Sequence, residues 1–173
     1  MALSKSVIWI NSLSLMLSCV SIQPETYRYR EVDYLLFKTI PNQIDSLPPF
    51  ALDLSGKNLE TIPTNYKSIK SLNVLNIGNN QIKNIGVEIC NASSLKVLIL
   101  NNNPIHELPE CLTTLEQLEV ISIIGTQVNE LPSTINKLSR LRILAIGGNP
   151  IPKEQILSIR KSLPNCRIIQ SVD

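Results

Sequence analysis

The residues that could carry out catalysis are few and scattered. His106 is the only histidine among the 173 residues, and neither it nor Glu107 beside it has a nucleophile in a matching place. The sequence contains no glycine-rich phosphate loop, no paired metal-ligand motif and no nucleophile elbow. We therefore expect His106 to be a solvated loop residue. We predict that the protein is not an enzyme and has no catalytic residues, no metal and no cofactor.

Cys19 is a candidate site for covalent attachment of a lipid. Residues 1–18 carry Lys5 as their only charge and are mostly apolar from residue 7 to 17, which is typical of a secretory signal too short to span a membrane. Residues 15–19, LMLSC, are similar to a bacterial lipobox, in which cleavage before the cysteine leaves it to carry lipid. The sequence thus predicts a lipoprotein signal at 1–18 and a protein lipid-anchored at the cell envelope or surface. Ordinary signal cleavage with secretion, or an unprocessed cytoplasmic chain, are the alternatives.

The overall charge argues against nucleic acid as a partner. Lys and Arg number 16 against 14 Asp and Glu, which gives a net charge of +2. Removal of residues 1–18 would take away Lys5 alone and bring the chain still closer to neutral. Binding to phosphates requires clustered Lys and Arg. We therefore expect a protein or peptide partner, contact with a membrane only through a lipid on Cys19, and no nucleic acid; the oligomeric state stays open.

A unit of 23 residues recurs along the chain and opens at Leu72, Leu95, Leu118 and Leu141. The four copies read LNVLNIGNNQI, LKVLILNNNPI, LEVISIIGTQV and LRILAIGGNPI, and ALDLSGKNL at 51–59 is a fifth copy one period upstream. A fixed period of 20 to 29 residues with this internal spacing resembles the leucine-rich repeat. The resemblance implies an α/β solenoid of about five coils, in which the repeats span residues 49–151.

Each half of the unit predicts a different element. Aliphatic residues such as Leu98 and Leu100 alternate with residues expected to be exposed, as in a short strand with one side on the core. The second half, LPECLTTL or LPSTINKL, contains Pro109 or Pro132, which is incompatible with a regular strand. We expect a parallel β-sheet on the concave side and an irregular or short-helical convex side.

The turn after each strand carries Asn80, Asn103 or Asn149, whose amides can satisfy backbone groups that the bend exposes. Stacked coils would align these amides in a ladder. The same place holds Lys57 in the first unit and Thr126 in the fourth. We expect Thr126 to be a weaker partner, and Lys57 to be tolerated because it lies in a terminal coil.

The flanking segments are predicted to cap the two ends of the solenoid. Residues 19–48 form a linker and a helical cap, because Val32, Leu35, Leu36 and Ile40 make a short apolar helical stripe before Pro41. Residues 152–173 form a helix-strand cap.

In the C-terminal cap, Pro152 suits a helix start, and Ile156, Ile159 and Leu163 share one helical face. Leu163, Cys166 and Ile168 then reproduce the strand spacing, in a unit one residue shorter than the others. This register places Cys166 where a core leucine lies in other coils, and predicts a buried, unreactive thiol.

Cys90 and Cys111 are expected on the convex side of adjoining units. One period before Cys111 is position 88, two residues from Cys90, so the two are not directly stacked. This offset disfavours a disulfide, which requires close and well-oriented α-carbons. Whether both are free thiols stays open.

The outward positions of the strands are the candidate binding surface, since a solenoid generally binds on its concave sheet. The predicted partner-binding residues are Val74, Asn76, Val97, Ile99, Asn101, Val120, Ser122, Ile124, Ile143 and Ala145. Of the outward positions in the five coils only Asp53 is charged. Such β-branched columns either stabilise the sheet by cross-strand packing alone or mark an exposed apolar interaction site.

The chain resembles exported, often lipidated leucine-rich-repeat proteins of spirochaetes and Bacteroidetes. Leu131, Pro132, Ile135 and Leu138 carry the convex pattern, and ALDLSGKNL and SLPNCRII are similar to the first and last segments of such proteins. The resemblance covers about residues 27–170 and implies a non-enzymatic protein-binding surface. We predict a surface- or membrane-anchored binding module; a cytosolic adaptor or enzyme regulator that uses the same face is the alternative.

Overall fold

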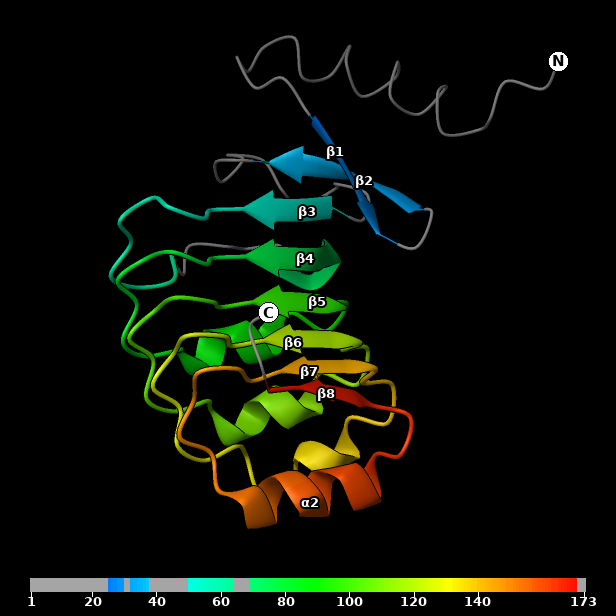
Figure 1. Ribbon diagram of the computed structural model, residues 1–173. Coiled ribbons are helices and arrows are strands. Elements are labelled where there is room, and N and C mark those ends of the chain that lie inside the picture. Colours follow the sequence, from blue (N-terminus) through cyan, green and yellow to red (C-terminus); the bar gives the residue numbers. More distant parts are fainter. Residues whose placement is uncertain (1–24, 30–31, 38–49, 64–68, 171–173) are drawn as a thin grey trace, which may run out of the picture.

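The computed structural model describes residues 25–29, 32–37, 50–63 and 69–170. Within them a single sheet of eight strands runs in chain order from β1 to β8 (Figure 1). The strands are β1 (Glu25–Tyr29), β2 (Val32–Phe37), β3 (Phe50–Asp53), β4 (Leu72–Asn76), β5 (Val97–Ile99), β6 (Val120–Ser122), β7 (Ile143–Ala145) and β8 (Arg167–Ile169). Successive strands from β2 to β8 pair in parallel, so the predicted solenoid with a parallel sheet is confirmed.

The 23-residue period of the sequence is also the register of the sheet. Val74 pairs with Val97, Val97 with Val120, and Val120 with Ile143. The intervening leucines, such as Leu75 and Leu98, point inward and are completely buried. One continuous core therefore fills the space between the sheet and the convex side.

Short 3-10 helices alternate with irregular segments on the convex side, which confirms the prediction of an irregular or short-helical convex side. They are η2 (Ile69–Ser71), η3 (Val87–Asn91), η4 (Glu110–Thr114) and η5 (Ile135–Lys137). Pro109 precedes the first residue of η4 with an extended backbone, where its missing N–H leaves no hydrogen bond unmade. Figure 1 shows η3, η4 and η5 stacked behind the sheet, with α2 (Lys153–Ser162) covering the C-terminal end of the stack.

The asparagine ladder is confirmed in its bonds. Asn103 Nδ2 donates to the carbonyls of Ile77 and Leu100, each at 2.9 Å, and its Oδ1 accepts from the Ile82 N–H at 3.0 Å. Asn80 and Asn149 make the corresponding bonds in their own coils. Each amide therefore ties its own turn to the preceding coil.

The two substitutions in the ladder behave differently. Thr126 is buried, and its single hydroxyl proton can go to the Ile123 carbonyl at 2.9 Å or to Asn149 Oδ1, but not to both. It is the weaker partner that the sequence predicts. Lys57 takes part through its backbone, whose N–H donates to Asn80 Oδ1 at 2.9 Å, while its side chain is exposed.

The helical N-terminal cap predicted from Val32, Leu35, Leu36 and Ile40 is wrong over residues 32–37, and Ile40 lies outside the described residues. Val32–Phe37 is strand β2, which pairs antiparallel with β1 and parallel with β3. A sheet edge leaves backbone N–H and C=O groups without partners, and a strand satisfies them where a helix laid across the edge would not. The apolar stripe in the sequence is too short to distinguish a helix from a strand here, and the open edge of β3 favours the strand.

The predicted C-terminal helix and strand are confirmed, but the predicted register between them is wrong. Ile168, and not Cys166, pairs with Leu144. An α-helix advances about 1.5 Å per residue against about 2.0 Å for a 3-10 helix, so more residues are needed to return to the sheet. The last unit is therefore longer than its predecessors, and Arg167 and Ile169 extend the concave columns.

Candidate functional site

The outward side chains of β3 to β8 form one continuous surface, here called the concave face. Its first column contains Ala51, Val74 and Val97, which are 0%, 2% and 2% exposed and pack together in a cluster separate from the main core. Ile99 and the next member, Val120, pack against this cluster and are only half-buried. The column is thus closed by cross-strand packing near the N-terminal coils and more open near the C-terminal coils.

The polar residues of the concave face hold the backbone. Asn101 Oδ1 accepts from Ser122 Oγ at 2.7 Å and from the Ile124 N–H at 2.9 Å, joining two coils. Asn76 Oδ1 accepts from the Gly78 N–H at 3.0 Å, and Asp53 Oδ1 makes the same bond to the Ser55 N–H. These oxygens hold their loops in place and so give the surface a fixed shape.

The structure brings the ten predicted residues together on one face of neighbouring strands, but not with equal access. Val74 and Val97 are nearly closed to solvent, and Ser122 and Ala145 are also buried. The half-buried members are Asn76, Ile99, Asn101, Val120, Ile124 and Ile143. A partner would therefore meet mainly this second group.

A groove at the starting ends of β6 and β7 was not predicted. It has a volume of about 660 Å³ and is lined by Glu119, Ser139, Arg140, Leu141, Arg142 and Asn165. Lys96, Glu119 and Arg142 occupy the second position of successive units, one residue before the outward columns begin. This regular placement of charge was the signal in the sequence that could have identified the rim of the face.

A second unpredicted feature is a column of left-handed residues just before the ladder position. Gly56, Asn79, Asn102, Gly125 and Gly148 have φ angles of 63°, 55°, 53°, 66° and 75°. Asn102 Nδ2 donates to Asn79 Oδ1 at 2.8 Å, so two of them also join neighbouring coils. Only Gly and Asn adopt this backbone readily, which explains the residue types at this spacing.

Cys90 and Cys111 form a disulfide, and the expectation against it is wrong. Their α-carbons lie 5.9 Å apart, within the range that a disulfide spans. The sequence argument compared equivalent positions of the two units. Two side chains that bridge neighbouring 3-10 helices come from different positions of the unit, because one is directed toward the next coil and the other back toward the previous coil. The offset of two residues in the unit satisfies this condition.

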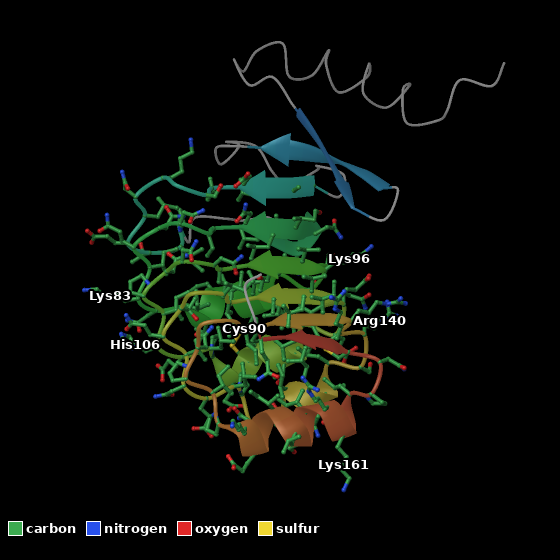
Figure 2. The ribbon with its side chains drawn as sticks, viewed as in Figure 1. Lys83, Cys90, Lys96, His106, Arg140 and Lys161 are labelled. Carbon is green, nitrogen blue, oxygen red and sulfur yellow. A yellow bond between two sulfur atoms is a disulfide. The ribbon has the colours of Figure 1, made fainter. Side chains whose placement is uncertain are left out.

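Cys166 and His106 lie in the environments that the sequence predicts for them. Cys166 is a free, buried thiol, and its burial raises its pKa above the ordinary value of 9.0, as expected for a core residue. His106 is exposed on the turn side of the coils, with Lys83 on the same side (Figure 2). Cys19 and the predicted signal lie outside the described residues.

The described part of the chain also bears on metal binding and membrane crossing. Within it, no three His, Cys, Asp or Glu side chains are grouped so that they could hold a metal ion. Over the same residues, no helix has the length and apolar character needed to cross a membrane.

Comparisons with known proteins agree with the coil geometry. The family described as "Leucine-rich repeat region" matches residues 51–169. No curated protein sequence matches the chain.

Three solved structures illustrate the fold. A leucine-rich-repeat protein of Leptospira interrogans is 29% identical, with a TM-score of 0.60, and the match covers 70% of this chain and 30% of that one. The internalin InlF of Listeria monocytogenes is 26% identical, with a TM-score of 0.58, over 69% of this chain and 33% of that one. The ectodomain of the receptor kinase SOBIR1 of Arabidopsis thaliana, 18% identical with a TM-score of 0.56, matches over 97% of this chain and 91% of that one, and shares the fold. The chain thus spans about a third of the length of the two bacterial proteins.

Proposed function

The chain belongs to the leucine-rich-repeat family, and on that premise we propose that it is a non-enzymatic module that binds a protein partner on its concave face. Repeat regions of this kind generally serve as protein-interaction modules. We further propose that the protein is exported and held at a membrane by a lipid on Cys19.

The observation that carries the binding proposal is the open, apolar C-terminal half of the concave face. Ile99, Val120 and Ile143 are half-buried on adjacent parallel strands, and Ile124 is half-buried in the turn after β6. They lie beside polar residues already fixed by hydrogen bonds. Cross-strand packing accounts for the closed first column but leaves these four side chains partly accessible. A fixed, partly apolar surface of this kind suits a protein partner.

The disulfide supports export. Structural disulfides persist in oxidising compartments and are rare in the cytosol of most organisms. The Cys90–Cys111 bond joins two adjacent coils on the convex side, away from the concave face. Together with the signal-like residues 1–18, it favours an exported protein over the cytosolic adaptor.

Binding is tested by capture of crosslinked partners from the native cells with wild type and the variant Val120→Lys/Ile143→Lys. We expect the variant to lose the specific partners, because two ammonium groups would replace apolar contact area on the face. The matched control is Val87→Lys/Leu157→Lys, since both side chains are 66% exposed and lie away from the sheet. If both variants fold and capture the same partners as wild type, the concave face is not the binding surface.

Export is tested by the intact mass and N-terminal peptide of the protein recovered from the native cells. A chain that begins at a lipid-modified Cys19 is the expected result. A chain that retains residues 1–18 would contradict the export proposal and favour the cytosolic adaptor. If the chain begins at a lipid-modified Cys19, replacement of Cys19 by Ser should release the exported protein from the membrane fraction.

A further inference from the structure

We propose that the C-terminal end of the concave face recognises an acidic segment of the protein partner through Arg140, Arg142 and Arg167. The inference rests on the proposed function and names the chemistry of the partner. All three arginine residues are exposed.

The fold brings these residues to one corner. Arg140 and Arg142 line the groove of about 660 Å³ at the starting end of β7. The Arg167 N–H donates to the Arg142 carbonyl at 2.7 Å, so β8 lies directly beside this groove. In the sheet register Arg167 pairs with Ile143, and it therefore extends the first concave column, whose other members are all aliphatic.

The corner carries more positive than negative charge. Glu119 lines the same groove and offsets one of the guanidinium groups. Arg140 Nη1 donates to Gln117 Oε1 at 2.6 Å, which fixes its direction without neutralising its charge. Lys96 occupies the position equivalent to Glu119 one coil earlier and lies on the same side of the molecule as Arg140 (Figure 2). Among the described residues of the corner, the three guanidinium groups thus outnumber the one carboxylate of Glu119.

The opposite end of the concave face differs. There Asp53 is the charged outward residue, and its carboxylate accepts a hydrogen bond from its own loop. The face therefore has the acidic residue Asp53 at one end, a closed apolar column in the coils at that end, and a basic corner beside half-buried Val120 and Ile143 at the other end. Such an arrangement orients a partner along the sheet as well as binding it.

Guanidinium groups suit carboxylates because the planar fork can donate two parallel hydrogen bonds. Neighbouring half-buried aliphatic side chains would hold apolar residues of the same segment. The segment that fits is thus an extended peptide with Asp or Glu at its β8 end, followed by aliphatic residues over β7 and β6.

The experiment uses two short fluorescent peptides with the same aliphatic residues, one containing glutamates and the other glutamines at those positions. Binding to the full chain is measured by fluorescence anisotropy at low salt, and the contacted residues are mapped by amide chemical-shift changes. We expect the acidic peptide to bind about tenfold more tightly than the glutamine peptide, as one or two charge-assisted hydrogen bonds would give. The shifts should centre on β7, β8 and the 139–142 segment.

The decisive variant is Arg140→Gln/Arg142→Gln/Arg167→Gln, which should bind the two peptides equally. Its matched control is Lys83→Gln/Lys153→Gln/Lys161→Gln, which removes the same charge at exposed positions outside the corner and should behave as wild type. If both variants bind the acidic peptide equally weakly, net charge alone explains the preference, and the inference is overturned. Tighter binding of a short single-stranded DNA than of the acidic peptide would also overturn it, in favour of a phosphate site.

Failure here is separable from failure of the proposed function. The capture experiment depends on Val120 and Ile143 and leaves the arginine residues unchanged. If the Val120→Lys/Ile143→Lys variant loses its partners but wild type does not prefer the acidic peptide, the concave face remains the proposed binding surface and only its preference for an acidic segment is wrong.

Discussion

At the scale of single residues, the ladder asparagines are the strongest structural requirement of the repeat. Replacing Asn103 by Ala would remove this partner from the Leu100 carbonyl and the Ile82 N–H in the buried interior, while the Ile77 carbonyl would keep its bond from Asn80 Nδ2. Since an unsatisfied buried group costs about 1–3 kcal/mol, we expect a loss of roughly 3 kcal/mol in the free energy of unfolding, measured by urea denaturation.

The neighbouring residue provides the control for this prediction. Asn102 is exposed and has a φ of 53°, so Asn102→Gly keeps the backbone conformation and removes only an exposed bond to Asn79. Its effect should stay within about 0.5 kcal/mol. Comparable losses in the two variants would mean that the ladder is not what stabilises the turns.

The thiol of Cys166 gives a prediction about pH. Burial raises its pKa in the folded chain, so the folded state keeps the proton at a pH where the unfolded chain releases it. The stabilisation is fully present below the unfolded pKa near 9 and is lost as pH rises through the folded pKa. Between pH 8 and 11 we expect the free energy of unfolding, measured by urea denaturation, to fall less in Cys166→Ala than in wild type. An unchanged pH dependence would show that other groups control it.

At the scale of elements, the disulfide ties η3 to η4 across two coils. Its two cysteines are 21 residues apart, and closing a loop of about that length is worth about 3 kcal/mol through the unfolded chain. We expect Cys90→Ser/Cys111→Ser to lower the free energy of unfolding by about this amount. A reductant should do the same to wild type and nothing to the variant. If reductant leaves wild type unchanged, the bond is absent in solution.

Besides its buried apolar face, α2 is joined to the preceding coil by the hydrogen bonds of one side chain, Gln155. Gln155 Oε1 accepts from the Leu131 N–H at 3.0 Å, and Gln155 Nε2 donates to the Leu131 carbonyl at 2.9 Å. Gln155→Ala leaves both backbone groups without this partner and should cost about 2 kcal/mol, measured by thermal unfolding. Glu154→Ala, at an exposed neighbouring position of the same helix, should cost far less.

At the scale of the whole molecule, the period of the sequence was sufficient to predict the coils, the register of β4 to β7 and the ladder. Each of these follows from a contact between equivalent residues, such as Val74 with Val97. The three predictions that were wrong concern contacts between non-equivalent residues. Cys90 meets Cys111 across an offset of two, β8 is shifted by a longer helix, and β2 forms because β3 has an open edge. The basic corner arises from the same shift, since only the observed register places Arg167 beside Ile143.

Because each coil touches only its neighbours, position along the stack should decide how far a defect spreads. Ile121 lies in a central coil and Ile156 in the terminal helix, and both are buried, so replacing either by Ala removes the same atoms. A terminal helix can fray while the remaining coils keep their contacts, but a central coil cannot open without dividing the stack. In hydrogen exchange, Ile156→Ala should speed exchange mainly in residues 152–170, and Ile121→Ala in β5, β6, β7 and the helices behind them. Equal spreading of exchange through the whole chain in both variants would contradict this, and would mean that the solenoid unfolds as one unit from either site.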